Sequence, residues 1–242
     1  MRTKLISLSL VLLMGMSVWA QESVTVSVYE DCSKNGKTED IRPSGEENGH
    51  TWVNLGLSVR WASCNIGATA PEDYGNYYAW GETETKADYS WATYKHANGA
   101  ENKLTKYCND ASYGDNGFTD DKTTLEPEDD AAHVNWGGVW RMPTDAEWTE
   151  LRNNCTWTWT TQNGVNGYLV TSEVNSNSIF LPAAGYRNGT DLRNAGSSGY
   201  YRSSSLNEDY PDNAWNVYFN SGRVYRSDYD RYYGQSVRPV CP

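Results

Sequence analysis

The sequence is poor in the residues and spacings on which most catalytic and metal sites depend. It contains three histidines (His50, His96 and His133), and none of them lies in a GxSxG or HExxH pattern. No two of its five cysteines stand at CxxC spacing, which argues against a zinc or redox site. We therefore expect a protein that is not an enzyme, in which each histidine is an ordinary surface or packing residue.

Beyond its N-terminal region the sequence has no apolar run long enough to cross a membrane. The run from Leu5 to Met16 follows the basic residues Arg2 and Lys4 and precedes Val18-Trp19-Ala20. This order of basic, apolar and small residues is typical of a secretory signal peptide, and the alternative is an uncleaved anchor. We expect residues 1–20 to be the signal peptide, and the protein to be secreted, periplasmic or held at the cell surface.

The charge balance is strongly acidic. The net charge is −11, and loss of Arg2 and Lys4 with the signal peptide makes it more negative. An acidic protein is repelled by nucleic acid and by anionic membrane surfaces, so neither is an expected partner. Export permits disulfides, and the odd number of cysteines leaves at least one thiol unpaired within a monomer. The pairing stays open among Cys32, Cys64, Cys108, Cys155 and Cys241.

The pattern of apolar residues predicts an extension followed by one domain. Residues 21–49 begin with a short alternating segment and continue through a stretch rich in Ser, Lys, Gly and Glu, typical of an N-terminal extension or linker. From Thr51 to Cys64, apolar and polar residues alternate as in paired short strands. We expect one domain over residues 50–242, with tryptophan and tyrosine supplying much of the core volume.

An oxygen-rich stretch follows within a long polar region. Carboxylate and amide oxygens are the ligands that calcium prefers, so this stretch could hold a structural calcium ion. Their spacing does not match an EF-hand loop, and the alternative is a solvated acidic surface or acidic residues at a helix N-terminus. No cofactor is expected. The residues are Asp110, Asp115, Asn116, Asp120, Asp121, Glu126, Glu128, Asp129 and Asp130.

A helix is predicted to begin at Thr144. Thr144 and Glu147 have the spacing of a capping box, and Asp145 lies in the first turn, where the helix dipole favours an acidic residue. Trp148 and Leu151 then form an apolar stripe along one side.

The last quarter of the chain, residues 185–242, has an unusual composition. It contains nine of the eighteen tyrosines and seven of the twelve arginines, but none of the eight lysines. Tyrosine, arginine, aspartate and serine are typical of recognition surfaces. In the predicted strand 214–220, Trp215, Val217 and Phe219 alternate with polar residues that would face the opposite side.

We therefore predict a ligand-binding face built from this segment, on which the side chains gather in an exposed cluster. The candidate ligand-binding residues are Arg193, Tyr200, Arg202, Tyr210, Asp212, Tyr218, Arg223, Tyr225, Arg226, Asp228, Tyr229, Asp230, Arg231 and Tyr232.

Several motifs in one order resemble the Fibrobacter succinogenes major paralogous domain family. They include Trp61-Ala62-Ser63-Cys64-Asn65-Ile66-Gly67-Ala68, Trp140-Arg141-Met142-Pro143-Thr144, Leu181-Pro182-Ala183-Ala184-Gly185-Tyr186-Arg187 and Gln235-Ser236-Val237-Arg238-Pro239-Val240. The helix entry also looks like that of C-type-lectin-like and formylglycine-generating-enzyme-like domains. The resemblance implies an α+β, C-type-lectin-like fold, with short helices around small twisted antiparallel sheets and long ordered loops.

The known activities of these folds do not transfer to the sequence. Formylglycine-generating enzymes use a C-terminal pair of cysteines, whereas this chain has only Cys241 there. Calcium-dependent lectins use Glu-Pro-Asn or Gln-Pro-Asp with Trp-Asn-Asp, whereas this chain has Glu126-Pro127-Glu128 and Trp215-Asn216-Val217.

The favoured hypothesis is an exported protein that binds a protein or glycan ligand on a cell or phage surface. The segment also looks like the variable region of a diversity-generating retroelement target, because mutagenesis of adenines in asparagine codons yields Tyr, Asp, Ser and Arg but never Lys. The plainer interpretation is a Tyr/Arg-rich surface that is not diversified. The alternatives are a calcium-independent glycan-binding module and a non-catalytic, formylglycine-generating-enzyme-like structural protein.

Overall fold

The computed structural model describes residues 42–242. The predicted signal peptide and most of the predicted extension, up to residue 41, lie outside the described residues. The folded part begins before the expected start at His50, because β1 (Ser44–Glu47) pairs with β2 (His50–Val53) in a hairpin. Asn48 and Gly49 join the two strands with positive φ angles of 45° and 77°, as a two-residue hairpin turn requires.

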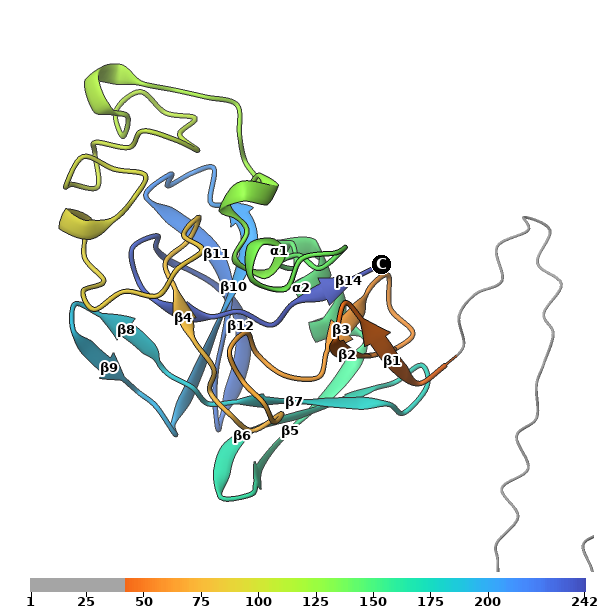
Figure 1. The fold of residues 1–242 in the computed structure, drawn as a ribbon. Helices are drawn as coiled ribbons and strands as arrows, with labels where there is room; N and C mark the ends of the chain where they lie inside the picture. The colour runs from red at the N-terminus through yellow and green to blue at the C-terminus, as the bar shows by residue number, and fades with distance from the viewer. Residues whose placement is uncertain (1–41) are drawn as a thin grey trace, which may run out of the picture. The chain divides into compact units, whose positions relative to one another are not determined.

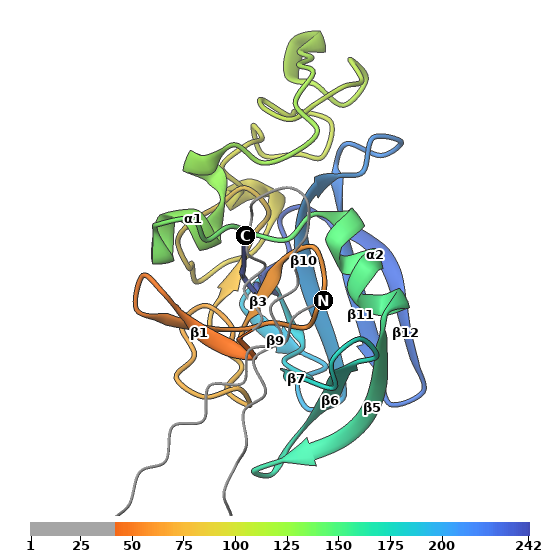
Figure 2. The same ribbon diagram turned by 90° about the vertical axis from the view of Figure 1, so that its right-hand side faces the viewer.

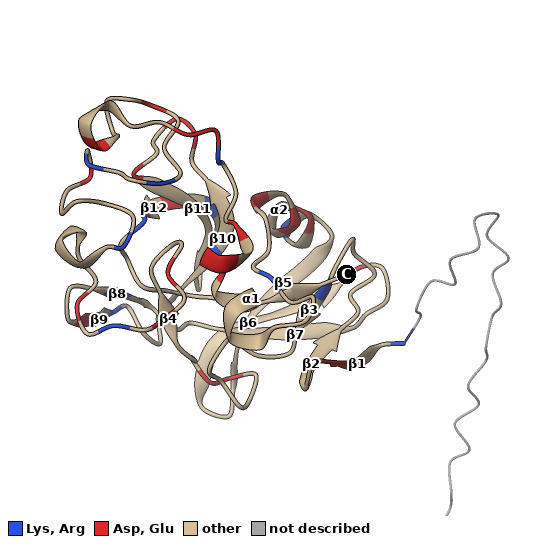
Figure 3. Ribbon diagram, turned by 45° about the horizontal axis from the view of Figure 1, so that its top comes forward, with Lys and Arg blue, Asp and Glu red and all other residues tan. Residues whose placement is uncertain are grey.

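The strands of the described residues form four sheets (Figure 1). The first has the order β1-β2-β3-β14, in which β3 is Arg60–Ala62 and β14 is Val240–Cys241. A three-stranded sheet contains β5 (Cys155–Gln162), β6 (Val165–Ser172) and β7 (Ser178–Pro182), and none of its strands has a charged residue (Figure 3). A separate hairpin pairs β8 (Tyr186–Asn188) with β9 (Asp191–Arg193).

The central sheet has the order β12-β11-β10-β13-β4. Its three long strands form an antiparallel meander, and the short strands β13 and β4 complete one edge. The bounds are β10 Ser198–Leu206, β11 Asn213–Asn220, β12 Arg223–Asp230, β13 Gln235–Ser236 and β4 Tyr77–Tyr78.

The prediction of an α+β, C-type-lectin-like fold is wrong. The described residues contain fourteen strands but two α-helices, α1 (Ala131–Trp136) and α2 (Asp145–Asn153). Alternating apolar and polar residues dominate the second half of the chain, which favours strands. Apart from β4 and α1, the polar region 67–135 forms loops with three single-turn 3-10 helices, at Trp91–Thr93, Asp115–Gly117 and Pro127–Asp129. Within residues 42–242, no helix is long and apolar enough to span a membrane.

The predicted helix at Thr144 is confirmed as α2. The Thr144 hydroxyl accepts a hydrogen bond from Glu147 N at 3.2 Å, and the Glu147 carboxylate accepts one from Thr144 N at 2.8 Å. Trp148 and Leu151 are buried. The helix packs beside β10, β11 and β12 (Figure 2), where Trp148 contacts the Tyr201 ring at a centroid distance of 5.8 Å.

The two faces of the central sheet differ as the alternation predicted for Val217 and Phe219. Both residues are buried, with Tyr201, in the same cluster as Trp148 and Leu151 of α2. The opposite face presents tyrosines from all three long strands. Large rings fill much of the core, as expected from the composition, and the fully buried tryptophans are Trp61, Trp80, Trp140 and Trp148.

Candidate functional site

A continuous row of tyrosine rings covers the face of the central sheet that points away from α2. Tyr200, Tyr218 and Tyr225 stand side by side on β10, β11 and β12 because the strand register pairs Tyr200 with Tyr218 and Tyr218 with Tyr225. Their ring centroids are 4.9 and 5.0 Å apart. The tyrosine row, as the term is used below, consists of Tyr186, Tyr200, Tyr218, Tyr225, Tyr229, Tyr232 and Tyr233.

The row continues beyond the three long strands. Tyr186 of β8 lies 4.7 Å from Tyr200 and 5.3 Å from Tyr233, measured between ring centroids. Tyr233 contacts Tyr232 at 4.4 Å, and Tyr232 contacts Trp91 at 5.2 Å. Tyr229 of β12 fills the angle between these rings, 5.5 Å from Tyr200. The row therefore runs from Arg223 and Tyr225 at one end to Trp91 at the other.

The row has a buried floor and half-exposed upper rings. Tyr200 is 4% exposed and Tyr218 is 9% exposed, so the expectation that both rings are exposed is wrong. The other five rings are half-buried. Burial raises the pKa of Tyr200 and Tyr232 well above the usual tyrosine value, so these hydroxyl groups are neutral at physiological pH.

Neutral amide side chains bind the hydroxyl groups of the floor. Asn194 Nδ2 donates to the Tyr200 hydroxyl at 3.1 Å, and Asn220 Nδ2 donates to the Tyr218 hydroxyl at 2.9 Å. Asn194 lies between β9 and β10, and Asn220 is the last residue of β11. The rings are thus fixed by packing on their sides and by hydrogen bonds at their tips.

Arg202, which we predicted as a ligand-binding residue, is instead a buried structural residue. Its exposure is 0%, and burial lowers its pKa to about 9. The guanidinium donates four hydrogen bonds of 2.7–3.4 Å to main-chain carbonyl oxygens, those of Tyr229, Asp230, Arg231 and Tyr233. It therefore shapes the segment that carries the far end of the tyrosine row.

Arg231 is also buried, with 0% exposure, and its predicted place on the exposed face is wrong. It lies among the rings of Trp80, Tyr94 and Tyr107, with the guanidinium carbon 4.7 Å from the Trp80 centroid. Its Nε donates to the Tyr94 hydroxyl at 2.8 Å. The other nitrogens donate to the carbonyl oxygens of Lys106, Tyr107 and Pro211.

A third buried arginine explains the composition of the segment further. Arg238 donates to the carbonyl oxygens of Ala62, Ser63 and Phe180 and to Asn65 Oδ1, at 2.7–3.1 Å. Arginine has five donors in one plane, whereas lysine has three on a single atom. Three of the seven arginines thus satisfy clusters of carbonyl oxygens that lysine could not, which is a structural reason for the lack of lysine.

Other predicted residues lie away from the row. Arg226 faces α2, where its Nε donates to Asp145 Oδ1 at 2.9 Å and its guanidinium stacks on Trp215. Asp228 accepts hydrogen bonds from Asn207 and Asn213. Strand alternation explains both, because even-numbered residues of β12 point to the opposite face from Tyr225 and Tyr229.

Of the remaining predicted residues, two lie beside the row. The Arg223 guanidinium is 5.2 Å from the Tyr225 centroid, and the Asp230 side chain hydrogen-bonds with Tyr232 and Tyr233. Asp230 is half-buried next to Arg231, and burial raises its pKa. Burial also raises the pKa of Asp212 to about 6. Tyr210 and Arg193 are exposed, but no ring contact joins either of them to the row in the described structure.

The candidate residues omitted three members of the site. Tyr186 and Tyr233 belong to the same tyrosine-rich segment, 185–242, whose composition could have indicated them as candidates. Trp91 comes from the polar region 67–135, more than a hundred residues away in sequence, and no local pattern connects it to Tyr232.

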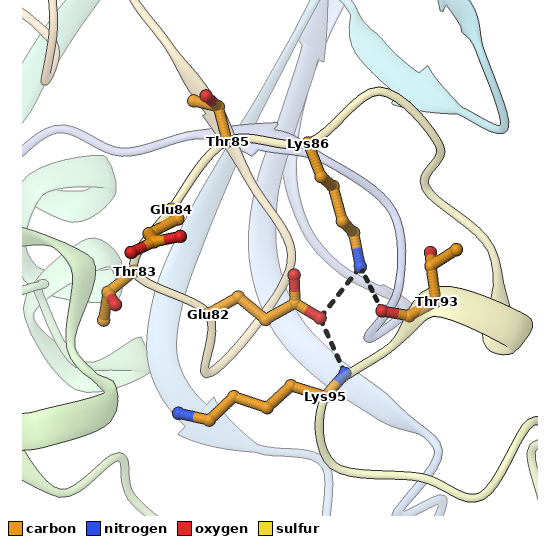
Figure 4. Close-up of a pocket in the computed structure, with 7 residues that line it drawn as sticks. All are labelled: Glu82, Thr83, Glu84, Thr85, Lys86, Thr93 and Lys95. Atoms are coloured by element: carbon orange, nitrogen blue, oxygen red, sulfur yellow. Dashed lines mark hydrogen bonds and ion pairs between the residues drawn. The ribbon is translucent and has the colours of Figure 1, made fainter.

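An open pocket of about 380 Å³ is a weaker candidate (Figure 4). Its central carboxylate, Glu82, accepts hydrogen bonds from Lys86 Nζ and from Lys95 N, both at 2.8 Å. Lys86 also donates to the carbonyl oxygen of Thr93 at 3.1 Å. The charges of Glu82 and Lys86 neutralise each other, and their hydrogen-bonding atoms already have partners. The pocket therefore has fewer free groups for a ligand than the tyrosine row has.

The two buried carboxylates of the oxygen-rich stretch, Asp129 and Asp130, bind other groups of this chain. Within residues 42–242, no group of three or more His, Cys, Asp or Glu side chains is arranged to hold a metal ion. Asp129 accepts from Lys95, Lys106 and the Tyr107 hydroxyl; burial opposes its ionisation, but these donors hold its pKa well below the usual range. Asp130 caps α1. Cys64, Cys108, Cys155 and Cys241 are not disulfide-bonded.

Comparison with known proteins adds one match. Residues 157–240 match a family described as a domain of unknown function (DUF8237). The match includes β10, β11, β12 and the tyrosine row. No curated protein and no solved structure matches the chain. The resemblance to the Fibrobacter succinogenes major paralogous domain family stays a prediction.

Proposed function

We propose that this chain is an exported binding protein and that the tyrosine row is its ligand-binding surface. The observation that carries the proposal is the unbroken contact among seven tyrosine rings, five of them half-buried, which starts on one face of the central sheet and continues onto β8 and the residues after β12. Tyrosine gives a large amphipathic contact area at low entropic cost. The partner is a protein or glycan on a cell or phage surface.

A binding role is favoured over catalysis by the environment of the histidines. His96 is buried, with its Nε2 2.9 Å from the Gly81 carbonyl oxygen. His50 stacks on Trp136 with 3.9 Å between ring centroids. Both side chains have packing roles of the kind expected from the sequence.

Diversification by a retroelement has less support than a fixed binding surface. Arg202 and Arg231 are among the residues that mutagenesis of adenines in asparagine codons can produce. Random replacement of either, however, would leave several buried carbonyl oxygens without donors. Only exposed positions such as Arg193 and Tyr210 could vary freely. A near-copy of the coding segment, differing at adenines and beside a reverse transcriptase gene, would decide the question.

The direct test combines three substitutions in the half-exposed part of the row, Tyr225→Ala, Tyr229→Ala and Tyr233→Ala. The labelled full chain is applied to immobilised panels of proteins and glycans, and binding and melting temperature are compared with those of the triple variant. The proposal expects lost binding with a folded protein. Tyr210→Ala is the matched control, because Tyr210 is 55% exposed and away from the row. A ligand bound equally by the triple variant would contradict the proposal.

A further inference from the structure

We infer that the ligand of the tyrosine row is an extended, uncharged carbohydrate chain, an inference that rests on the proposed function. It follows from which side chains the fold leaves at the surface and which it withdraws.

Most of the arginines that the sequence predicts for this surface do not lie on it. Arg202 and Arg231 are buried, and Arg226 points toward α2 on the other side of the sheet. Arg223 is the one predicted arginine beside the rings, at the Tyr225 end. Protein interfaces typically combine aromatic residues with arginine. A surface of rings with Arg223 only at its Tyr225 end favours an uncharged ligand.

The aromatic rings, hydroxyl groups and amides of the row suit a sugar ring, which has both apolar C–H groups and polar hydroxyl groups. Aromatic faces bind the apolar C–H side, and hydroxyl groups and amides exchange hydrogen bonds with the sugar hydroxyls. Here the amides of Asn194 and Asn220 lie at the hydroxyl groups of Tyr200 and Tyr218. The acidic net charge of the protein disfavours anionic polysaccharides.

The shape of the site favours a chain over a single sugar. The rings form a row from Tyr225 through Tyr200 and Tyr233 to Trp91, each within 6 Å of the next. A single sugar covers only part of such a row, whereas an oligosaccharide can follow its half-buried rings. From Tyr229 through Tyr186, Tyr233 and Tyr232 to Trp91, neighbouring ring centroids lie 4.4–6.3 Å apart. Because mutual packing holds the rings in place, little side-chain entropy is lost when the ligand binds.

The test is calorimetric titration of the full chain with soluble polysaccharides. The neutral probes are galactomannan, xyloglucan, mixed-linkage β-glucan and starch, and the acidic probes are polygalacturonate and hyaluronan. We expect at least one neutral polysaccharide to bind, and binding to persist in about 0.5 M NaCl, where surface charge interactions are largely screened. Longer oligosaccharides of that polymer should bind more tightly than its monosaccharide.

Variants connect the binding to the row. Tyr229→Ala should weaken binding by about tenfold or more, which corresponds to roughly 1.4 kcal/mol per factor of ten. Tyr229→Phe keeps the ring and should retain most of the affinity, and Tyr210→Ala should have no effect. The melting temperatures of these single-residue variants separate misfolding from loss of contact with the ligand.

The outcomes distinguish the inference from the proposed function. Binding only to an acidic polysaccharide, or failure of every glycan, overturns the inference. A protein ligand that is lost in Tyr229→Ala overturns the carbohydrate assignment but keeps the row as the binding site. A neutral glycan that binds the wild type and the triple row variant equally overturns both.

Discussion

Arg202 holds Asp230 by its main chain: Nη2 donates to the Asp230 carbonyl oxygen at 2.7 Å. The same guanidinium binds three further carbonyl oxygens between residues 229 and 233. A residue predicted to contact ligand thus instead fixes the backbone that carries Tyr229, Tyr232 and Tyr233.

Replacement of Arg202 by lysine should destabilise the fold despite retention of the charge. A lysine ammonium cannot reach four carbonyl oxygens, and each buried group left unsatisfied costs roughly 1–3 kcal/mol. We expect a loss of about 3 kcal/mol in the free energy of unfolding, measured by urea denaturation. Arg223→Lys, at an exposed position, should change it by less than about 0.5 kcal/mol. Equal stability of the two variants would show that the carbonyl cluster is unimportant.

Gly199 should not tolerate even one added methyl group. The Phe219 ring lies directly over it, and a Cβ built on Gly199 would approach Phe219 Cζ to 2.1 Å. Overpacking of this kind typically costs about 1–3 kcal/mol, so Gly199→Ala should lower the melting temperature by several degrees. Gly222→Ala is the control, because the nearest atom is 3.7 Å away. A wild-type melting temperature for Gly199→Ala would contradict the packing described here.

His96 should make stability fall as the pH is lowered from 6.5 toward 4. Burial lowers its pKa from 6.5 to about 4, so over this interval the unfolded chain binds a proton that the folded chain does not. Stability is therefore full above pH 6.5 and declines below it, by up to about 3 kcal/mol from this residue. His96→Gln should flatten the slope of unfolding free energy between pH 7 and pH 5, whereas His133→Gln should keep it. An unchanged slope in His96→Gln would assign the dependence to other groups.

Replacement of Arg226 tests which face of the central sheet binds the ligand. Because its side chain pairs with Asp145 and stacks on Trp215, Arg226→Ala should cost about 1 kcal/mol of stability. Ligand affinity should stay the same, in contrast to Tyr229→Ala on the neighbouring face. Titration of both variants with the same ligand measures the difference, and a comparable loss of affinity in Arg226→Ala would place the site on the α2 side.

Local sequence patterns predicted local features well. The capping box at Thr144 and the inward side of Val217 and Phe219 depend on neighbouring residues, and both are confirmed. Alternation also separates Tyr200 and Arg202 from the α2 face. It does not reveal that residues 229–233 fold back over Arg202, because that contact joins segments almost thirty residues apart.

The fold class failed for a related reason. Short motifs near the helix entry suggested a known arrangement of helices and sheets, but the described residues form fourteen strands and only two α-helices. Long ordered loops were expected, and they lie between Gly67 and Asn135. These loops are ordered by long-range contacts such as Arg231 with Lys106 and Tyr107. No periodicity in the sequence predicts contacts between segments more than a hundred residues apart.

The positions of β13 and β14 have a consequence for the order of folding. β13 lies between β10 and β4, and β14 pairs with β3, so residues 235–241 complete two sheets that begin near the start of the domain. Contacts so distant in sequence make folding slow and late. Because synthesis begins at the N-terminus, the growing chain cannot complete these two sheets until residues 235–241 have been made.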